Sequence, residues 1–374
     1  MISIIGAGPA GNYAASLLAK HDKVHVYEDH NEIGRPIQCT GLLTSNIENI
    51  VPIKQEFLVN KIGNARIFAP NQECIDFKLR KKNYVVDRQL FDGYFASLAE
   101  SNGAVYHLNH RFTGCSINQS IKLKFSNGNT AETDILIGAD GPRSEVAKSA
   151  GIFGSRRFMI GAQARVRLNE KIDPDLIEFH LPEQGFGWLV PEDDKIARIG
   201  VGVYTNTKKY FDEMLGRYKY KILEWQSGVI PLYDRSIKVE KDNIFLLGDA
   251  AAQVKATTAG GLVPAFAAAK ELSIAIKNNE SYSKRLKKLN LELWLSLLMR
   301  KAMDRFSQHD YNSLLRLCSQ PRIKRIIENT DRDYPSRFIF KTLLLEPRFL
   351  RFGLKLIPDL IPQYRAYPSK PVQP

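Results

Sequence analysis

Cysteine is scarce and scattered in this chain of 374 residues. The four cysteines, Cys39, Cys74, Cys115 and Cys318, show no Cys-x-x-Cys spacing, which argues against a zinc site and against a disulfide framework. The seven histidines show no metal-ligand spacing with acidic partners either, so we predict no metal. Unpaired thiols suit a reducing compartment, and we therefore expect the protein in the cytoplasm.

Long apolar runs are also missing. The chain enters an apolar segment at once (Met1 to Ile5), without the basic region, apolar core and small-residue cleavage site of a secretory signal, so we predict no export. The apolar C-terminal quarter contains no run of about 18 apolar residues, so we expect that it does not span a membrane. Internal repeats and low-complexity linkers are absent as well.

The positive charge is concentrated at one end of the sequence. Residues 281–374 contain 19 Lys and Arg against 8 Asp and Glu, and so carry +11 of the formal net charge of +13. These basic residues alternate with Leu, Phe and Pro, a pattern that fits contact with an anionic membrane surface. An ordinary helical lid with solvated charges fits equally well. Nucleic acid is not expected as a partner, because no recognition motif accompanies the basic residues.

A glycine motif opens the chain. Gly6, Gly8 and Gly11 form G-x-G-x-x-G directly after a predicted strand and at the start of a predicted helix. A second strand (residues 23–27) ends at Glu28, the acidic residue expected to bind ribose hydroxyls. This order of strand, helix, strand and acidic residue along the chain predicts dinucleotide binding. No second glycine motif is present for a nicotinamide nucleotide.

Two further apolar strands end in a small residue and an aspartate. The first, in residues 131–137, leads to Asp140-Gly141, and the second, in residues 243–247, leads to Asp249. Each places a carboxylate at the carboxyl edge of a parallel sheet, where ligands bind. Either aspartate alone would also fit a simple strand-to-turn cap.

Between these motifs the pattern changes to alternating strands, and after residue 280 helices dominate. We predict an α/β fold with a Rossmann-like domain formed by 1–150 and 243–280, an inserted mainly-β substrate domain at 151–242, and a basic helical region at 281–374. Part of 45–85 is open to assignment to the substrate domain. The Ala-rich stretch from Leu262 to Ile276 is predicted to be helical despite Pro264.

The three motifs together resemble the FAD signatures of the p-hydroxybenzoate-hydroxylase-like flavoprotein superfamily. The resemblance covers the chain to about Ile276 and implies FAD as cofactor. It places Glu28 at the adenosine ribose, Asp249 and Arg88 along the pyrophosphate or ribityl part, and Gly260 to Leu262 at the flavin. The full set of cofactor contacts that it implies is Gly6, Gly8, Pro9, Ala10, Gly11, Glu28, Arg35, Cys39, Thr40, Gly41, Arg88, Asp140, Gly141, Asp249, Gly260, Gly261 and Leu262.

Four segments resemble the geranylgeranyl reductases more closely. They are GRPIQCTGLL (34–43), YVVDRQLFD (84–92), GFGWLVP (185–191) and VKATTAGGL (254–262). The resemblance is to the archaeal type, which saturates the isoprenoid chains of membrane lipids, whereas chlorophyll-pathway relatives usually have Cys-Gly-Gly where this chain has Cys39-Thr40-Gly41.

Two sets of residues keep alternative roles at this stage. Phe186 and Trp188 alternate on a predicted strand and share a face, where they either wall a groove for an apolar substrate or form a core aromatic pair. Cys39 either packs as a small apolar residue, or contacts the flavin, or supplies the proton for alkene reduction as the candidate catalytic residue.

The main functional hypothesis is an FAD-dependent reductase of C=C bonds in geranylgeranyl chains, working at the inner face of the cell membrane. The isoprenoid lipid is then the substrate partner, and reduced ferredoxin or NAD(P)H is the electron donor. A monooxygenase of the aromatic-hydroxylase kind shares the cofactor motifs. A non-catalytic FAD redox sensor that uses Cys39 is the third alternative.

Overall fold

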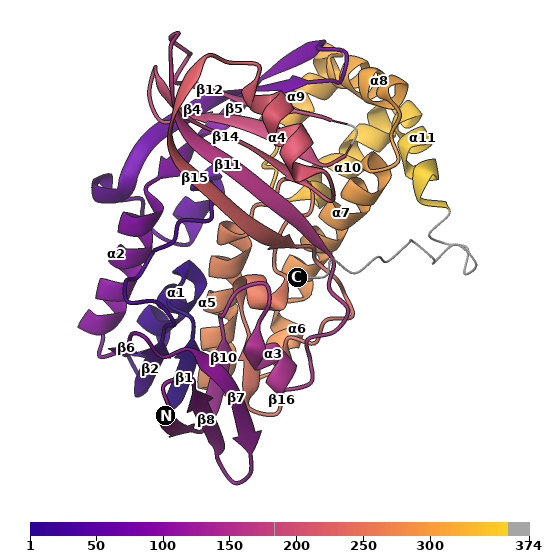
Figure 1. Ribbon diagram of the computed structural model, residues 1–374. Coiled ribbons are helices and arrows are strands. Elements are labelled where there is room, and N and C mark those ends of the chain that lie inside the picture. Colours follow the sequence, from indigo (N-terminus) through magenta and orange to yellow (C-terminus); the bar gives the residue numbers. More distant parts are fainter. Residues whose placement is uncertain (183, 358–374) are drawn as a thin grey trace.

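The computed structural model describes residues 1–182 and 184–357. Figure 1 shows a lower part built around a parallel sheet and an upper part built around a larger, mostly antiparallel sheet, with the C-terminal helices beside the latter. The fold class predicted from sequence, α/β with a Rossmann-like domain, a β-rich part and a helical C-terminal region, is confirmed.

The lower sheet has six strands, five of them parallel. Its order is β16 (Glu240–Lys241), β17 (Ile244–Leu246), β10 (Ile135–Gly138), β1 (Ile2–Ile5), β2 (Val24–Tyr27) and β6 (Val105–His107). Successive side chains point to opposite faces, so Ile4 packs under the helices while Ile5 packs on the other side. The strands therefore read as continuous apolar runs because both faces are covered.

One face of this sheet is covered by α1 (Pro9–Leu18), α2 (Arg88–Ser101) and α5 (Leu262–Asn278). The other face is covered by α3 (Glu145–Ser149) and a three-stranded sheet of β7 (Phe112–Ile117), β8 (Ile121–Phe125) and β9 (Thr130–Thr133). The helix predicted across Pro264 is confirmed. Pro264 stands in the first turn of α5, and the first helical hydrogen bond follows it, from the Ala265 N–H to the Gly261 carbonyl.

The single strand predicted for residues 131–137 is wrong. The segment divides at Asp134 into β9, which belongs to the three-stranded sheet, and β10, which belongs to the parallel sheet. The Asp134 carboxylate forms an ion pair of 2.7 Å with the N-terminal ammonium group of Met1. Apolar content does not reveal such a change of sheet, since both halves are strand.

The upper sheet has eight strands in the order β15 (Tyr220–Pro231), β11 (Phe158–Leu168), β14 (Ile196–Val203), β13 (Phe186–Pro191), β12 (Leu176–His180), β4 (Leu58–Phe68), β5 (Cys74–Val86) and β3 (Leu42–Leu43). Neighbouring strands are antiparallel except β12 and β4. Residues 42–86 thus supply three strands to this sheet. The division of the chain into 1–150 with 243–280, 151–242 and 281–374 stays a prediction. The strands of 45–85, for part of which the prediction was open, lie in this sheet.

Helices cover both faces of the upper sheet (Figure 1). One face packs against α4 (Thr207–Leu215). The other packs against helices of the C-terminal region, through Leu293 and Leu297 of α7 and Leu315 of α8. That region contains α6 (Tyr282–Arg285), α7 (Lys287–Met303), α8 (Gln308–Cys318), α9 (Pro321–Asn329), α10 (Pro335–Leu345) and α11 (Leu350–Gly353). Short 3-10 turns complete the fold at Ser45–Asn49, Gln55–Phe57, Gly248–Ala251, Pro347–Phe349 and Leu354–Leu356.

Candidate functional site

The turn between β1 and α1 forms one end of the site. Gly6 has φ +103°, and a Cβ on it would lie 2.4 Å from the Ala139 carbonyl oxygen. A Cβ on Gly11 would lie 2.0 Å from the Gly6 carbonyl oxygen, so both positions require glycine. Gly8 caps α1 without a side chain, and a Cβ there would meet no atom within 4 Å. Because no side chain caps α1 and Gly8, Pro9 and Ala10 line the pocket, this helix start is open to a pyrophosphate.

Glu28 follows β2 at the same edge of the sheet. Its carboxylate accepts hydrogen bonds from the Ala7 N–H (2.6 Å) and the His30 N–H (3.2 Å), and lies 2.6 Å from His30 Nδ1. Burial is the main cause of the raised pKa of Glu28, and the bond from Ala7 opposes it. These contacts fix the carboxylate beside the glycine turn. His30 carried no recognisable motif in the sequence and was not predicted.

Two half-buried aspartates, Asp140 and Asp249, follow the ends of β10 and β17. Burial raises the pKa of Asp140, whose Oδ2 accepts the Val146 N–H at 3.0 Å. Its Oδ1 is buried and has no hydrogen-bond partner within residues 1–182 and 184–357. Burial also raises the pKa of Asp249 to about 6, against the attraction of Arg88 and Arg156. Asp140 Oδ1 is thus short of a donor that a polyhydroxylated ligand can supply.

Arg156 is a site residue that the sequence did not reveal. Its guanidinium donates to the Ala250 carbonyl at 2.6 Å and to the Pro142 carbonyl at 3.3 Å, and so joins the two aspartate turns. Burial lowers its pKa, while Asp140 and Asp249 raise it. Arg156 lies far from Ala250 in the sequence and is not part of a motif, so the sequence did not predict this role.

The segment Gly34 to Thr40 lines the same pocket. Gly41, just behind it, has φ +69°, and a Cβ there would lie 2.4 Å from the Val86 carbonyl oxygen. The Cys39 Sγ accepts the Gly41 N–H at 3.4 Å, which holds the thiol in the loop. Arg35 Nε donates to Gln89 Oε1 at 3.1 Å and ties the start of the loop to α2.

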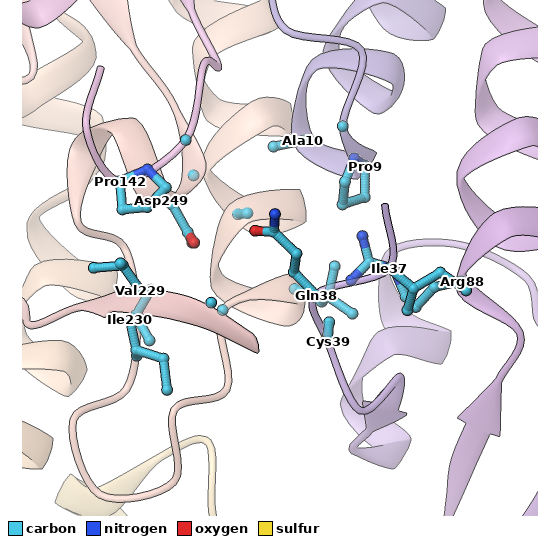
Figure 2. Close-up of a pocket in the computed structure, with 18 of the residues that line it drawn as sticks. Pro9, Ala10, Ile37, Gln38, Cys39, Arg88, Pro142, Val229, Ile230 and Asp249 are labelled. Atoms are coloured by element: carbon cyan, nitrogen blue, oxygen red, sulfur yellow. The ribbon is translucent and has the colours of Figure 1, made fainter. Parts of the chain in front are cut away.

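Arg88 stands at the first position of α2, as the sequence predicted, and pairs with Asp92 at 2.7 Å. Figure 2 shows Arg88 close to Cys39, with Gln38 extending into the space between Pro9 and Asp249. Despite the opposing effect of burial, Asp92 and Cys39 raise the pKa of Arg88. The loop, the head of α2 and the glycine turn therefore converge on one space.

An aromatic wall bounds the far end of the pocket. Phe186 and Trp188 pack on the same face of the upper sheet with ring centroids 5.5 Å apart. The Trp188 indole N–H donates to Gln163 Oε1 at 2.9 Å, and Thr40 Oγ1 donates to the same oxygen at 2.7 Å. Gln163 in turn donates to Gln226. This network joins the wall to the Cys39 loop, and neither glutamine was predicted.

One pocket of about 790 Å³ brings almost all predicted site residues together. Its lining includes Gly6, Gly8, Pro9, Ala10, Glu28, Arg35, Cys39, Thr40, Arg88, Asp140, Gly141, Phe186, Trp188, Asp249, Gly260, Gly261 and Leu262. Gly11 and Gly41 do not line it and instead allow close backbone packing behind it. Val229 and Ile230 of β15, missed by the sequence reasoning, form a further wall (Figure 2).

The residues present fit an FAD. The uncapped start of α1 offers N–H groups for the pyrophosphate and Glu28 offers a carboxylate for ribose. Asp140 and Asp249 line the same pocket and offer carboxylate oxygens for further hydroxyl groups. Gly260 and Gly261 line the pocket at the start of α5. These individual contacts stay predictions.

Among the described residues, the side chains that could bind a metal ion gather at one position. One group of three ligating side chains occurs there, Glu28, Asp29 and His30. Its buried member, Glu28, already accepts a hydrogen bond from the Ala7 N–H and lies 2.6 Å from His30 Nδ1. The absence of a metal stays a prediction.

Comparison with known proteins gives relatives that match most of the chain. A family model described as an NAD(P)-binding Rossmann-like domain matches residues 4–40. A digeranylgeranylglycerophospholipid reductase of Methanococcus vannielii is 29% identical and covers 70% of this chain and 72% of its own length. A second protein of that name, from Methanocaldococcus jannaschii, is 26% identical and covers 95% of this chain and 98% of its own.

Two solved structures share the fold along most of the chain. A geranylgeranyl bacteriochlorophyll reductase-like protein of Thermoplasma acidophilum superposes with a TM-score of 0.78 at 22% identity, covering 96% of this chain and 98% of that one. A halogenase solved in complex with FAD superposes with a TM-score of 0.65 at 14% identity, covering 97% and 95%. The chain thus shares the fold of these solved structures and is similar, along most of its length, to proteins named digeranylgeranylglycerophospholipid reductase.

Proposed function

We propose that the protein is an FAD-dependent reductase that hydrogenates C=C bonds of geranylgeranyl chains, with digeranylgeranyl glycerophospholipids as substrates. The observation that carries the proposal is the single pocket in which the cofactor motifs meet the Cys39 loop and the Phe186–Trp188 wall. The names of the relatives support the substrate class. Because a fold alone does not define a reaction, the proposal depends on this combination.

When bound and reduced, FAD would supply the hydride for the alkene. The chain's own residues would do the rest. Phe186 and Trp188 would hold the apolar chain and exclude water, and the indole N–H of Trp188 is already satisfied by Gln163, so the wall presents no unpaired donor to the lipid. Arg88 and Asp92 would fix the head of α2 against the cofactor.

We further propose that Cys39 supplies the proton to the second alkene carbon. Its thiol lines the pocket and is held by the Gly41 N–H, so its position is defined relative to the loop. A thiol is mostly protonated at neutral pH and can act as an acid. Packing against the flavin is the alternative role, and substitution of Cys39 separates the two.

Membrane docking completes the proposal. None of the helices in the part of the chain that the structure describes is long and apolar enough to cross a bilayer. Yet α10, α11 and the turn after them expose large apolar side chains beside basic residues such as Lys341, Arg348 and Arg351: Phe340, Leu344, Leu345, Leu350, Leu354 and Ile357. This basic apolar face, as we name it, would dock on the anionic cytoplasmic leaflet, where the substrate resides. The predicted tail beyond residue 357 lies outside the described residues.

Anaerobic flavin reoxidation tests the reaction. The photoreduced holoenzyme is mixed with digeranylgeranyl glycerophospholipid without oxygen, and flavin absorbance is followed. A reductase recovers the oxidised spectrum with the lipid alone. Reoxidation that requires oxygen would favour the monooxygenase, and a spectrum unchanged by lipid would favour a redox sensor. Parallel reduction by NADH, NADPH or ferredoxin identifies the electron donor.

A further inference from the structure

Arg332 lies between α9 and α10 and lines the pocket at its aromatic end. Its Cζ is 5.9 Å from the ring centroid of Phe179, another lining residue. Phe179 on β12 pairs directly with Trp188 on β13, so the two side chains stand on the same face of the upper sheet. Arg332 therefore belongs to the end of the pocket where we place the lipid, away from the glycine turn.

The guanidinium of Arg332 is short of partners. Its Nε is buried and has no hydrogen-bond partner among residues 1–182 and 184–357. The flanking carboxylates are engaged by other groups. Asp333 accepts from Lys255 Nζ and from Thr44 Oγ1, and Asp331 Oδ1 accepts the Asp333 N–H at 2.9 Å. A charged, buried donor with unmade hydrogen bonds is costly, which favours an anion arriving from outside the chain.

The same carboxylates position Arg332. The ion pair of Lys255 and Asp333 is buried, since these residues are only 6% and 8% exposed, and it ties the segment after α9 to the loop that leads to Gly260. Burial and the neighbouring Asp333 raise the pKa of Asp331. The ion pair of Asp333 with Lys255 thus fixes the backbone next to Arg332 and keeps its guanidinium at the pocket.

We infer that Arg332 binds the phosphoryl group of the prenyl substrate at the aromatic end of the pocket. The inference rests on the proposed function, because it names the part of that substrate which the pocket recognises. A guanidinium presents a planar fork that matches two phosphoryl oxygens. A glycerophospholipid and a free prenyl diphosphate both carry this group. The neighbouring aromatic wall would receive the apolar chain that leaves it.

The test is a binding titration on FAD-loaded protein, read as the change in oxidised-flavin absorbance. The probes are digeranylgeranyl glycerophospholipid, geranylgeranyl diphosphate and uncharged geranylgeraniol. Arg332→Gln should weaken binding of a phosphorylated probe about tenfold or more and leave geranylgeraniol unchanged, because one charge-assisted interaction is lost. Arg332→Lys should retain part of the affinity. A loss confined to the phospholipid or to the diphosphate supports the inference and identifies the natural source of the phosphoryl group.

Arg235→Gln is the matched control, because Arg235 also stacks on an aromatic ring, 4.4 Å from the centroid of Trp294, but does not line the pocket. It should bind all three probes like the unmodified protein. Equal weakening of geranylgeraniol by Arg332→Gln, or weaker FAD retention with unchanged phosphoryl binding, would overturn the inference.

Failure of the proposed function is recognised separately. The titration needs no turnover, so Arg332-dependent binding without alkene-dependent reoxidation would refute the reductase alone. Full reoxidation by phospholipid with an Arg332→Gln protein of unchanged affinity would refute the role of Arg332 alone.

Discussion

Asp249 should make the FAD-free protein less stable at neutral pH than an asparagine variant. Burial raises its pKa from 3.8 to about 6, so the folded protein holds this proton to a higher pH than the unfolded chain does. The ionised carboxylate therefore lowers the free energy of unfolding as pH rises from about 4 to about 6, and the whole cost is present above that. A shift of roughly two pKa units corresponds to about 3 kcal/mol at pH 7.5 and about half of that at pH 5.

Urea unfolding of FAD-free protein at the two pH values measures this effect. Asp249→Asn should be more stabilising at pH 7.5 than at pH 5 by roughly 1.5 kcal/mol, and comparing the two pH values cancels any pH-independent change in hydrogen bonding. Asp212→Asn on the exposed surface of α4 serves as the control and should show no such difference. FAD affinity should fall in the Asp249 variant, since the carboxylate is the better acceptor for hydroxyl groups. A stability gain that is the same at both pH values would refute the reasoning.

Three further predictions concern packing, proton transfer and docking. Gly11→Ala should lower FAD affinity at least tenfold and destabilise the fold by about 1–3 kcal/mol, because its Cβ would meet the Gly6 carbonyl at 2.0 Å. Gly93→Ala is the control and should leave FAD affinity unchanged, because a Cβ on Gly93 in α2 would meet no atom within 4 Å. Equal FAD affinities of the two variants would contradict the packing argument. Cys39→Ala should slow lipid-dependent reoxidation about a hundredfold or more in stopped-flow traces, and full rates in both Cys39→Ala and Cys39→Ser would exclude proton donation. Replacing Leu344 and Leu354 together by Gln should weaken sedimentation with anionic liposomes roughly thirtyfold, whereas Leu90→Gln on α2 should leave it unchanged; an equal loss in both would point to a general effect on the protein.

The cofactor end was predictable because its determinants are local. The glycine turn, Glu28 and the two aspartates each depend on a short segment in which a strand ends at a defined residue, and the parallel sheet then aligns those ends at one edge. The head of α2 at Arg88 and the shared face of Phe186 and Trp188 follow from helical and strand periodicity in the same way. For these residues, sequence spacing translates directly into position.

The rest of the pocket depends on contacts between distant segments. Arg156 reaches Ala250, Gln163 meets Trp188 from another strand, and Lys255 pairs with Asp333 from the C-terminal region. Each contact joins segments that lie far apart in the sequence, so local spacing does not predict it. The strand break at Asp134 has the same origin, since its partner is the N-terminus.

The central claim is that the pocket reduces alkenes, and product analysis after a single anaerobic turnover tests it most directly. Reduced holoenzyme is incubated with digeranylgeranyl glycerophospholipid in deuterated water without oxygen, and the lipid is examined by mass spectrometry. We expect one saturated bond for each flavin reoxidised, with solvent-derived deuterium at both former alkene carbons, because the hydrogen that a reduced flavin transfers also exchanges with solvent. Lipid recovered unchanged while the flavin is reoxidised only on admission of oxygen would contradict it.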